Sequence, residues 1–348
     1  MSSIASNQLN IGNWIYGSGG NIGIGIATPL AKFHVAADIL INGLMIGRGG
    51  GDIISNTIIG SGALQSNTTG TGNTANGYRA LLSNITGYTN TAMGHLSLTT
   101  NTTGYANTAM GNRSLFSNST GSYNTAIGDN SMSGNTTGAY NTAVGASSLE
   151  MNTTGNFNTA NGVNALEMNT TGSNNTAVGF QALVLNTLGG WNTANGAGAL
   201  QSNTIGNANT ANGYQSMFFN TGGSQNTANG YQALALNTLG NNNAAFGFQS
   251  LLNNGTGSNN TAVGLQSLRS NTVGFNNTAN GAGALFTNTT GYNNTANGTT
   301  SLYSNTTGYN NVANGVGALY SNTTGTGNTA VGVAALYSNT TGVRNAAM

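Results

Sequence analysis

The chain has 348 residues, and only 3% of them are Asp, Glu, Lys or Arg, against about a quarter in ordinary soluble domains. The formal net charge of +1 gives no electrostatic basis for binding nucleic acid or an anionic membrane surface. Cysteine is absent, which excludes disulfides and thiolate metal sites, and no apolar run is long enough for membrane insertion.

Residues 1–55 follow no repeat and predict a small β segment. Apolar residues alternate with Gly at its start, which is typical of a strand, and Asn42-Gly43 is a tight-turn pair. The segment is too small to bury a substantial core. We therefore expect it to intertwine with other copies of the chain or to cover the first repeat as an attachment or cap. The expected strands are residues 22–26, 33–35, 39–41 and 44–46, the last two forming a hairpin.

From Asn56 onward the sequence repeats every 17 residues without insertion or deletion. Seventeen copies fill residues 56–344, and residues 345–348 begin another. A short fixed period predicts a solenoid, in which each coil packs only on its neighbours. Gly, Asn, Ser and Thr at this density are also typical of disorder, but a disordered chain has no reason to keep register. We number positions 1 to 17 from the first Asn of each copy.

Four repeat positions are invariant: Asn at positions 1 and 12, and Gly at positions 5 and 15. Gly and Asn accept positive φ readily, so we expect these positions to be corners of the coil. Position 3 is Ala except for Ile58, and position 9 is Leu except for Met132 and Met217. We expect these two rows to fill the lumen. The prediction is an all-β fold, a parallel β-solenoid or β-roll of 17-residue coils.

Asn at position 12 is expected to stack on its counterpart in the next coil. Such an amide ladder pairs every donor with an acceptor along a parallel stack of coils. The residues assigned to it are Asn67, Asn84, Asn101, Asn118, Asn135 and Asn152.

One Leu and one Ala in each coil make a thin core, which favours an oligomer. Position 4 mixes apolar residues with Asn, and it points outward if position 3 points inward. Such a row is interpreted as a homotrimer interface in which Asn fixes the register; the alternative is a solvated face. The interface candidates are Ile127, Val144, Val178, Phe246, Val263 and Val331.

Aromatic residues recur at position 10 in four consecutive coils near the end of the chain. The preferred interpretation is a stack that stabilises the solenoid, and the alternative is a glycan-facing platform. The residues are Phe286, Tyr303, Tyr320 and Tyr337.

No residue pattern indicates catalysis, a cofactor or a metal site, so we expect no enzyme. His34 and His95 are far apart in the sequence. Glu150 and Glu167 occupy position 10 of adjacent coils, where they are expected to repel each other on an exposed face. Thr rows at positions 2, 13 and 14 leave an ice-binding solenoid as a remote alternative, although Leu and Val interrupt them.

Residues 21–35 read Asn-Ile-Gly-Ile-Gly-Ile-Ala-Thr-Pro-Leu-Ala-Lys-Phe-His-Val. This stretch resembles the Gly-Ile-Gly-Thr-Thr-Pro…Lys-Leu-His-Val segment of bacteriophage tail fibre proteins, although residues 26–27 are Ile-Ala in place of Thr-Thr. In those proteins it often accompanies Asn-Thr-Ala-x-Gly-x-x-Ala-Leu repeats, as it does here. Residues 141–145, Asn-Thr-Ala-Val-Gly, are similar to the core of the head repeats of trimeric autotransporter adhesins. That resemblance implies trimers of left-handed parallel β-rolls with Ala in the lumen.

The resulting hypothesis is a structural fibre shaft of a bacteriophage tail fibre, holding or forming a host-recognition surface. Its partners would be two further copies of itself, a host surface glycan or other virion components, with no nucleic acid. A self-assembling extracellular filament, built by end-to-end stacking, and a bacterial surface adhesin are the alternatives. Residues 1–7 lack a signal peptide's charged start and apolar core. We therefore expect the protein to be made in a cytoplasm and found in a virion or a filament. Because residues 345–348 begin a repeat that they do not complete, we expect an uncapped final coil that docks on another component or receives the N-terminal segment of another trimer.

Overall fold

The structure is a computed structural model that describes residues 10–11 and 14–348. The first seven residues, on which the signal-peptide prediction depends, lie outside this range. The fold is all-β, with no α-helix among the described residues, and the predicted parallel β-solenoid of 17-residue coils is confirmed. The chain divides between Thr120 and Gly121 into two compact units, which are described separately.

The described part of the first unit consists of short strands and one turn of 3-10 helix. The elements are β1 (Asn10–Ile11), β2 (Ile15–Ser18), β3 (Asn21–Ile24), β4 (Phe33–Val35), β5 (Ile39–Ile41), β6 (Leu44–Gly47), η1 (Gly50–Asp52), β7 (Thr57–Ile59), β8 (Thr74–Asn76), β9 (Thr91–Met93) and β10 (Thr108–Met110).

Strands β1 to β4 form a four-stranded sheet in sequence order. β2 pairs antiparallel with β3, and β3 pairs parallel with β4 through Ile22 and Phe33. The expected strand at residues 22–26 ends at Ile24, because Gly25 adopts a φ of 71° and turns the chain. β2 was not predicted, because Gly and Ser in it hide the alternation that marks a strand.

The predicted hairpin at residues 39–46 is present as β5 and β6. β6 also pairs antiparallel with β7, the strand of the first coil, through Ile46 and Ile59. The following helix η1 continues this contact, since the Gly50 amide donates to the Leu64 carbonyl at 3.0 Å. The hairpin and η1 therefore satisfy backbone groups that the first coil would otherwise leave open.

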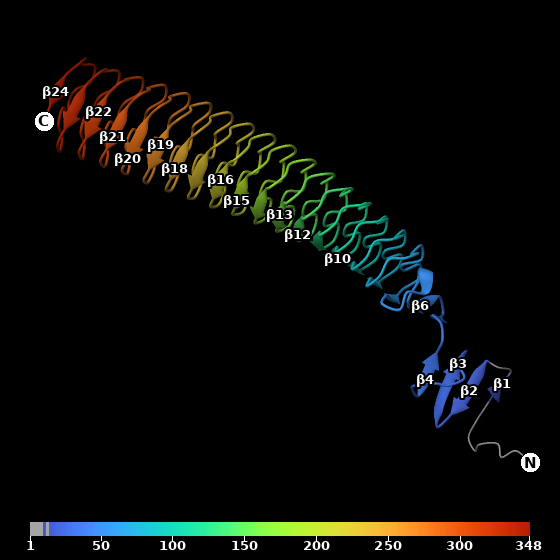
Figure 1. The fold of residues 1–348 in the computed structure, drawn as a ribbon. Coiled ribbons are helices and arrows are strands. Elements are labelled where there is room, and N and C mark those ends of the chain that lie inside the picture. Colours follow the sequence, from blue (N-terminus) through green and yellow to red (C-terminus); the bar gives the residue numbers. More distant parts are fainter. Residues whose placement is uncertain (1–9, 12–13) are drawn as a thin grey trace, which may run out of the picture. The chain divides into compact units, whose positions relative to one another are not determined.

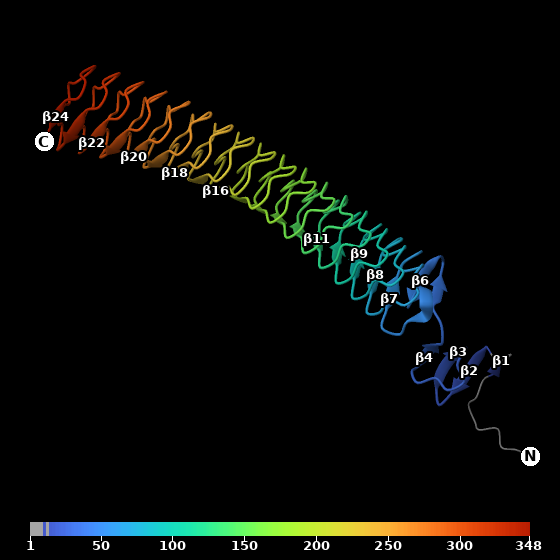
Figure 2. The same cartoon turned by 45° about the horizontal axis from the view of Figure 1, so that its top comes forward.

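The second unit has one strand in each coil, at positions 2 to 4, and successive strands pair parallel and in register, as Ala143 with Ala160. Figures 1 and 2 show these strands side by side along each unit. They are β11 (Thr125–Ile127), β12 (Thr142–Val144), β13 (Thr159–Asn161), β14 (Thr176–Val178), β15 (Thr193–Asn195), β16 (Thr210–Asn212), β17 (Thr227–Asn229), β18 (Ala244–Phe246), β19 (Thr261–Val263), β20 (Thr278–Asn280), β21 (Thr295–Asn297), β22 (Val312–Asn314), β23 (Thr329–Val331) and β24 (Ala346–Ala347).

The lumen contains the rows that the repeat predicts. Position 3, including Ile58, and position 9, including Met132 and Met217, are fully buried, except that position 9 of the last coil, Leu336, is half-buried. Position 8, always Ala or Ser, is buried beside them in every coil but the last, where Ala335 is half-buried. Burying each Leu side chain contributes about 1.5–3 kcal/mol before entropy is subtracted.

The expected corner conformations were largely wrong. Only Gly at position 5 has positive φ among the four invariant positions, whereas positions 7, 9 and 17 are left-handed in every coil. Position 9 has φ between 48° and 54°, although it is almost always Leu. A left-handed Leu is unfavourable by about 1–2 kcal/mol. Backbone bonds between coils hold it there, as where the Leu166 amide donates to the Ala182 carbonyl at 3.0 Å.

Candidate functional site

The invariant Asn at position 12 forms a buried ladder. In the middle of the second unit, Asn186 donates from Nδ2 to Asn169 Oδ1 at 2.8 Å and to the Gly189 carbonyl at 2.9 Å. Its Oδ1 accepts from Asn203 Nδ2 at 2.8 Å, so both amide hydrogens and the oxygen are paired. The same rung-to-rung bonds join the residues assigned from the sequence: Asn67 with Asn84, Asn84 with Asn101, Asn101 with Asn118, and Asn135 with Asn152.

A second ladder, at position 1, was missed. Asn175 Nδ2 donates to the Gly189 carbonyl at 2.8 Å, and Asn175 Oδ1 accepts from the Asn192 amide at 3.0 Å. The Gly189 carbonyl thus accepts from both ladders, and a Cβ at Gly189 would collide with Asn186 and with the Gly206 carbonyl. Asn at positions 1 and 12 and Gly at position 15 are all invariant in the repeat, and this shared invariance is the sequence signal that indicates the network. The invariant residues therefore hold the fold and leave no group for a ligand.

The position 4 candidates form an outward row on the strand face of the coils. Ile127, Val178, Val263 and Val331 are 36–40% exposed, as is Phe246, and Val144 is half-buried. Flanking Ala residues of the same strands point into the lumen. The row is therefore apolar surface interrupted by Asn, on the strand side of each coil.

The position 10 aromatics stack on one another. The ring centroids of Phe286, Tyr303, Tyr320 and Tyr337 lie 4.9–5.2 Å apart in successive pairs, with interplanar angles of 4° to 7°. Each inner ring thus has both faces covered by its neighbours, and a sugar ring stacks on a face. The stacked rings therefore stabilise the solenoid. A ring face is available to a ligand only where the next coil of a column has no aromatic residue.

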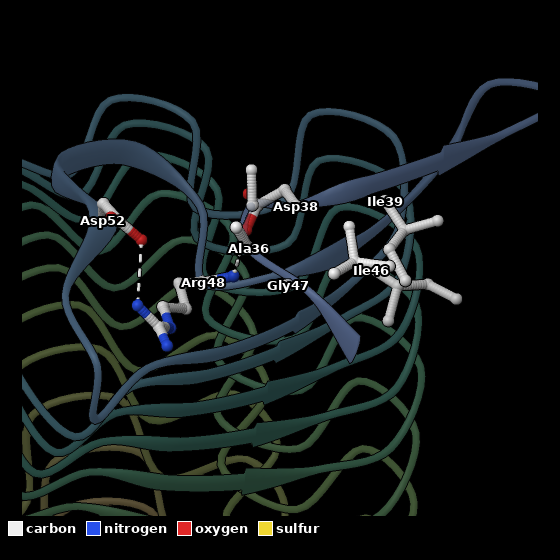
Figure 3. Close-up of a pocket in the computed structure, with 9 residues that line it drawn as sticks. Ala36, Asp38, Ile39, Ile46, Gly47, Arg48 and Asp52 are labelled. Carbon is white, nitrogen blue, oxygen red and sulfur yellow. Dashed lines mark hydrogen bonds and ion pairs between the residues drawn. The ribbon is translucent and has the colours of Figure 1, made fainter. Parts of the chain in front are cut away.

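A hollow with charged side chains in its walls lies beside the hairpin of β5 and β6 in the first unit. Its volume is about 240 Å³ (Figure 3). Asp38 accepts the Arg48 amide at 2.7 Å through one carboxylate oxygen and the Gly49 amide at 3.1 Å through the other. Arg48 pairs with Asp52 at 3.2 Å. The carboxylate of Asp38 is therefore engaged in holding the backbone that leads to η1.

Glu167 and His95 each contact an uncharged neighbour. Glu167 accepts from Asn164 Nδ2 at 2.6 Å, and the ring of His95 stacks on Tyr78 with centroids 5.5 Å apart. No group of three or more potential metal ligands occurs among residues 10–11 and 14–348. In the same described ranges, no helix has the length and hydropathy to cross a bilayer.

The sparse charge makes a prediction about solution conditions. We expect the melting temperature to change little between about pH 5 and 9 and with added salt, because few side chains can differ in bound protons between the folded and unfolded states. The chain contains only six Lys or Arg, five Asp or Glu and two His residues. Calorimetry over this range checks the prediction, and a strong pH dependence would show an ionised site that governs stability.

A neutral groove lies on the second unit, over positions 6, 7, 10 and 11. Two hollows of about 100 and 380 Å³ lie on either side of Phe218, which lines both. Neither is lined by a charged side chain; the walls are aromatic rings, aliphatic groups and Gln amides. Apolar walls with a few amides are typical of sites for neutral ligands. Sequence reasoning missed this groove because it arises only when rows are aligned between coils.

No known family model matches the chain, and a search of curated proteins gives no significant match. The fold and the ladders therefore define the class directly: the chain is a repeat protein with a parallel β-solenoid fold.

Proposed function

We propose that the chain is a structural fibre shaft, the solenoid part of a bacteriophage tail fibre, which presents a surface for recognising a host. The observation that carries the proposal is how completely the repeat is used for stacking. Asn186 and its equivalents bond to the adjacent coils and to the backbone of their own coil, and the position 10 rings stack on one another. Such a chain builds length and regular outer rows. The resemblance of residues 21–35 and of the repeat to tail fibre proteins supports the same assignment.

The working assembly in this proposal is a homotrimer. The position 4 row supplies a continuous, partly apolar face with Asn at intervals. The first unit adds exposed apolar side chains, with Trp14 77% and Leu30 87% exposed. Such surface is usually covered by another chain. The partners proposed are therefore copies of this chain, with a host glycan or a virion component at the outer surface.

The ice-binding alternative gains no support from the Thr rows at positions 13 and 14. Position 13 hydroxyls donate to carbonyls of the next coil, as Thr153 does to the Thr170 carbonyl at 2.9 Å. Leu188 and Leu239 interrupt the neighbouring row at position 14 and are more than half exposed. These rows therefore lack the regular array of free hydroxyls that binding to ice requires.

An antibody raised against the purified chain tests the assignment. On lysates of the source culture, we expect gold-labelled antibody to decorate the tails of phage particles in electron micrographs. Decoration of bacterial surfaces would favour the adhesin, and decoration of long cell-free filaments would favour end-to-end stacking. Either result would overturn the tail fibre proposal. Preimmune serum and antibody absorbed with the purified chain are the controls.

A further inference from the structure

The aromatic column at position 6 of the second unit lacks one ring. Adjacent rings stack where they occur, with centroids 5.5 Å apart for Tyr214 and Tyr231 and 5.2 Å apart for Tyr231 and Phe248. The next members are Ala197 and then Phe180. Phe180 and Tyr214 are therefore two coil spacings apart, about 10 Å at the usual strand spacing. Phe180 and Tyr214 are 55% and 50% exposed.

The adjacent column at position 7 lacks a side chain in the same coil. Gln266 donates from Nε2 to Gln249 Oε1, Gln249 to Gln232, and Gln232 to Gln215, at 3.0–3.1 Å. The next position in that direction is Gly198. Gln215 Nε2 therefore has no described side chain to donate to where the ladder ends. The coil that contains Ala197 and Gly198 therefore lacks an aromatic ring at position 6 and an amide side chain at the neighbouring position 7.

The smaller hollow, of about 100 Å³, occupies this place. Its floor is Ala197 and Gly198, and a Cβ on Gly198 would already lie 3.3 Å from the Phe218 ring. Gln201 Nε2 reaches Gln181 Oε1 at 3.3 Å, a long bond that a ligand group can replace. The lining residues are Phe180, Gln181, Ala197, Gly198, Gln201, Tyr214, Gln215 and Phe218.

We propose that this slot binds one neutral pyranose ring of a glycan, which takes the place of the missing aromatic ring. The C–H faces of a pyranose are apolar and pack on aromatic faces, and two coil steps leave room for one ring between Phe180 and Tyr214. Its hydroxyl groups would accept from Gln215 Nε2 and bond to the other amides. A neutral sugar matches a hollow without charged walls. An aromatic side chain of a partner protein would fill the space but leave these amides unpaired, which is unfavourable.

The larger hollow, of about 380 Å³, extends the site along the same face. It shares Phe218 and Gln215 with the slot and opens over Ala235, which is a small residue at position 10. A sugar linked to the ring in the slot would lie against Phe218 there. The biological role of the site rests on the proposed function of presenting a receptor-binding surface. Binding of a sugar at the slot can be measured whether or not that function is correct.

The test uses saturation-transfer NMR on the full chain. The probes are the methyl glycosides of glucose, galactose, mannose and N-acetylglucosamine, with the glycoside of N-acetylneuraminic acid as a charged comparison and p-cresol as an aromatic one. We expect at least one neutral glycoside to bind. Ala197→Tyr should weaken it at least about ten-fold, because the new ring occupies the slot. Gln215→Leu should also weaken it by removing the amide donor.

The filling variant is chosen because it should fold. Position 6 already carries Tyr in other coils, as at Tyr214, so the melting temperature should stay constant or rise. Ala282→Tyr makes the same change at position 6 of a coil outside the groove, and it should leave binding unchanged. Binding of no neutral glycoside, equal effects of the two Tyr variants, or binding of p-cresol alone would overturn the proposal. None of these results alters the antibody test of the fibre assignment.

Discussion

Replacing Asn186 by Asp should destabilise the chain by about 3–5 kcal/mol at neutral pH, the range for an uncompensated buried charge. Asn186 is fully buried, and its Nδ2 donates to two oxygens, Asn169 Oδ1 and the Gly189 carbonyl. The substitution keeps the shape of the side chain but replaces the donor with an oxygen that faces both acceptors. This isosteric change in the buried ladder should therefore lower the free energy of unfolding more than a substitution of an exposed side chain does.

The effect of Asn186→Asp should depend on pH with a defined sign. Burial and the facing acceptors should raise the pKa of the new carboxyl in the folded state above its unfolded value. A raised folded pKa means that the variant is least destabilised below the unfolded pKa, and that stability is lost as the pH rises through the folded pKa. Thermal melting of the variant and of the parent chain from acidic to neutral pH measures this trend.

The matched control for that experiment is Asn242→Asp. Asn242 is exposed at position 17 and has a φ of 56°, which Asp also tolerates. We expect a change within about 0.5 kcal/mol. Amide hydrogen exchange adds a local readout, because coils next to Asn186 should open before the rest of the array. Equal melting temperatures for the two variants would mean that the buried ladder contributes no net stability.

The sequence predicts the repeat period and the buried rows better than it predicts the backbone conformation within one coil. The 17-residue period, the Ala and Leu rows and the strand at positions 2 to 4 follow from pattern alone. The left-handed turns do not, because no local preference places Leu183 at a φ of 52°. Burial and bonds to the adjacent coils impose that conformation and override propensity. The conformational freedom of Gly predicts a corner at position 15, whereas in the structure contacts with the ladders and the next coil exclude a side chain at Gly189.

The candidate binding site also has one part that the sequence predicts and one part that only the structure shows. Each residue of the slot is unremarkable in its own repeat, since Ala197 and Gly198 are small residues in a Gly-rich chain. The signal appears only when columns are read across coils, where Phe180, Ala197 and Tyr214 form one row. The structure adds the direction of the Gln bonds, which shows that Gln215 ends its ladder with an unused donor group. Periodicity locates such columns, but side-chain orientation is needed to identify a gap as a site.

Replacing Val144, Val178 and Val263 together by Asp should abolish trimers if the position 4 row is the interface. In the proposed trimer these side chains meet in a dry contact, where each added charge is unpaired and faces like charges. Such a charge costs several kcal/mol, and every 1.4 kcal/mol is about ten-fold in Kd. We therefore expect a change from trimer to monomer in analytical ultracentrifugation, with the far-ultraviolet circular dichroism of the solenoid retained at low temperature.

The control for the interface must add the same charge elsewhere on the same unit. Asn174, Asn242 and Asn259 are exposed at position 17, where the left-handed backbone accepts Asp. Their triple replacement by Asp should leave the trimer intact, because these side chains lie on a different row from position 4. A parent chain that sediments as a stable monomer would remove the trimer from the proposed function. If both triple variants dissociated equally, general charge repulsion would explain the result, and the interface would have to be sought on another row.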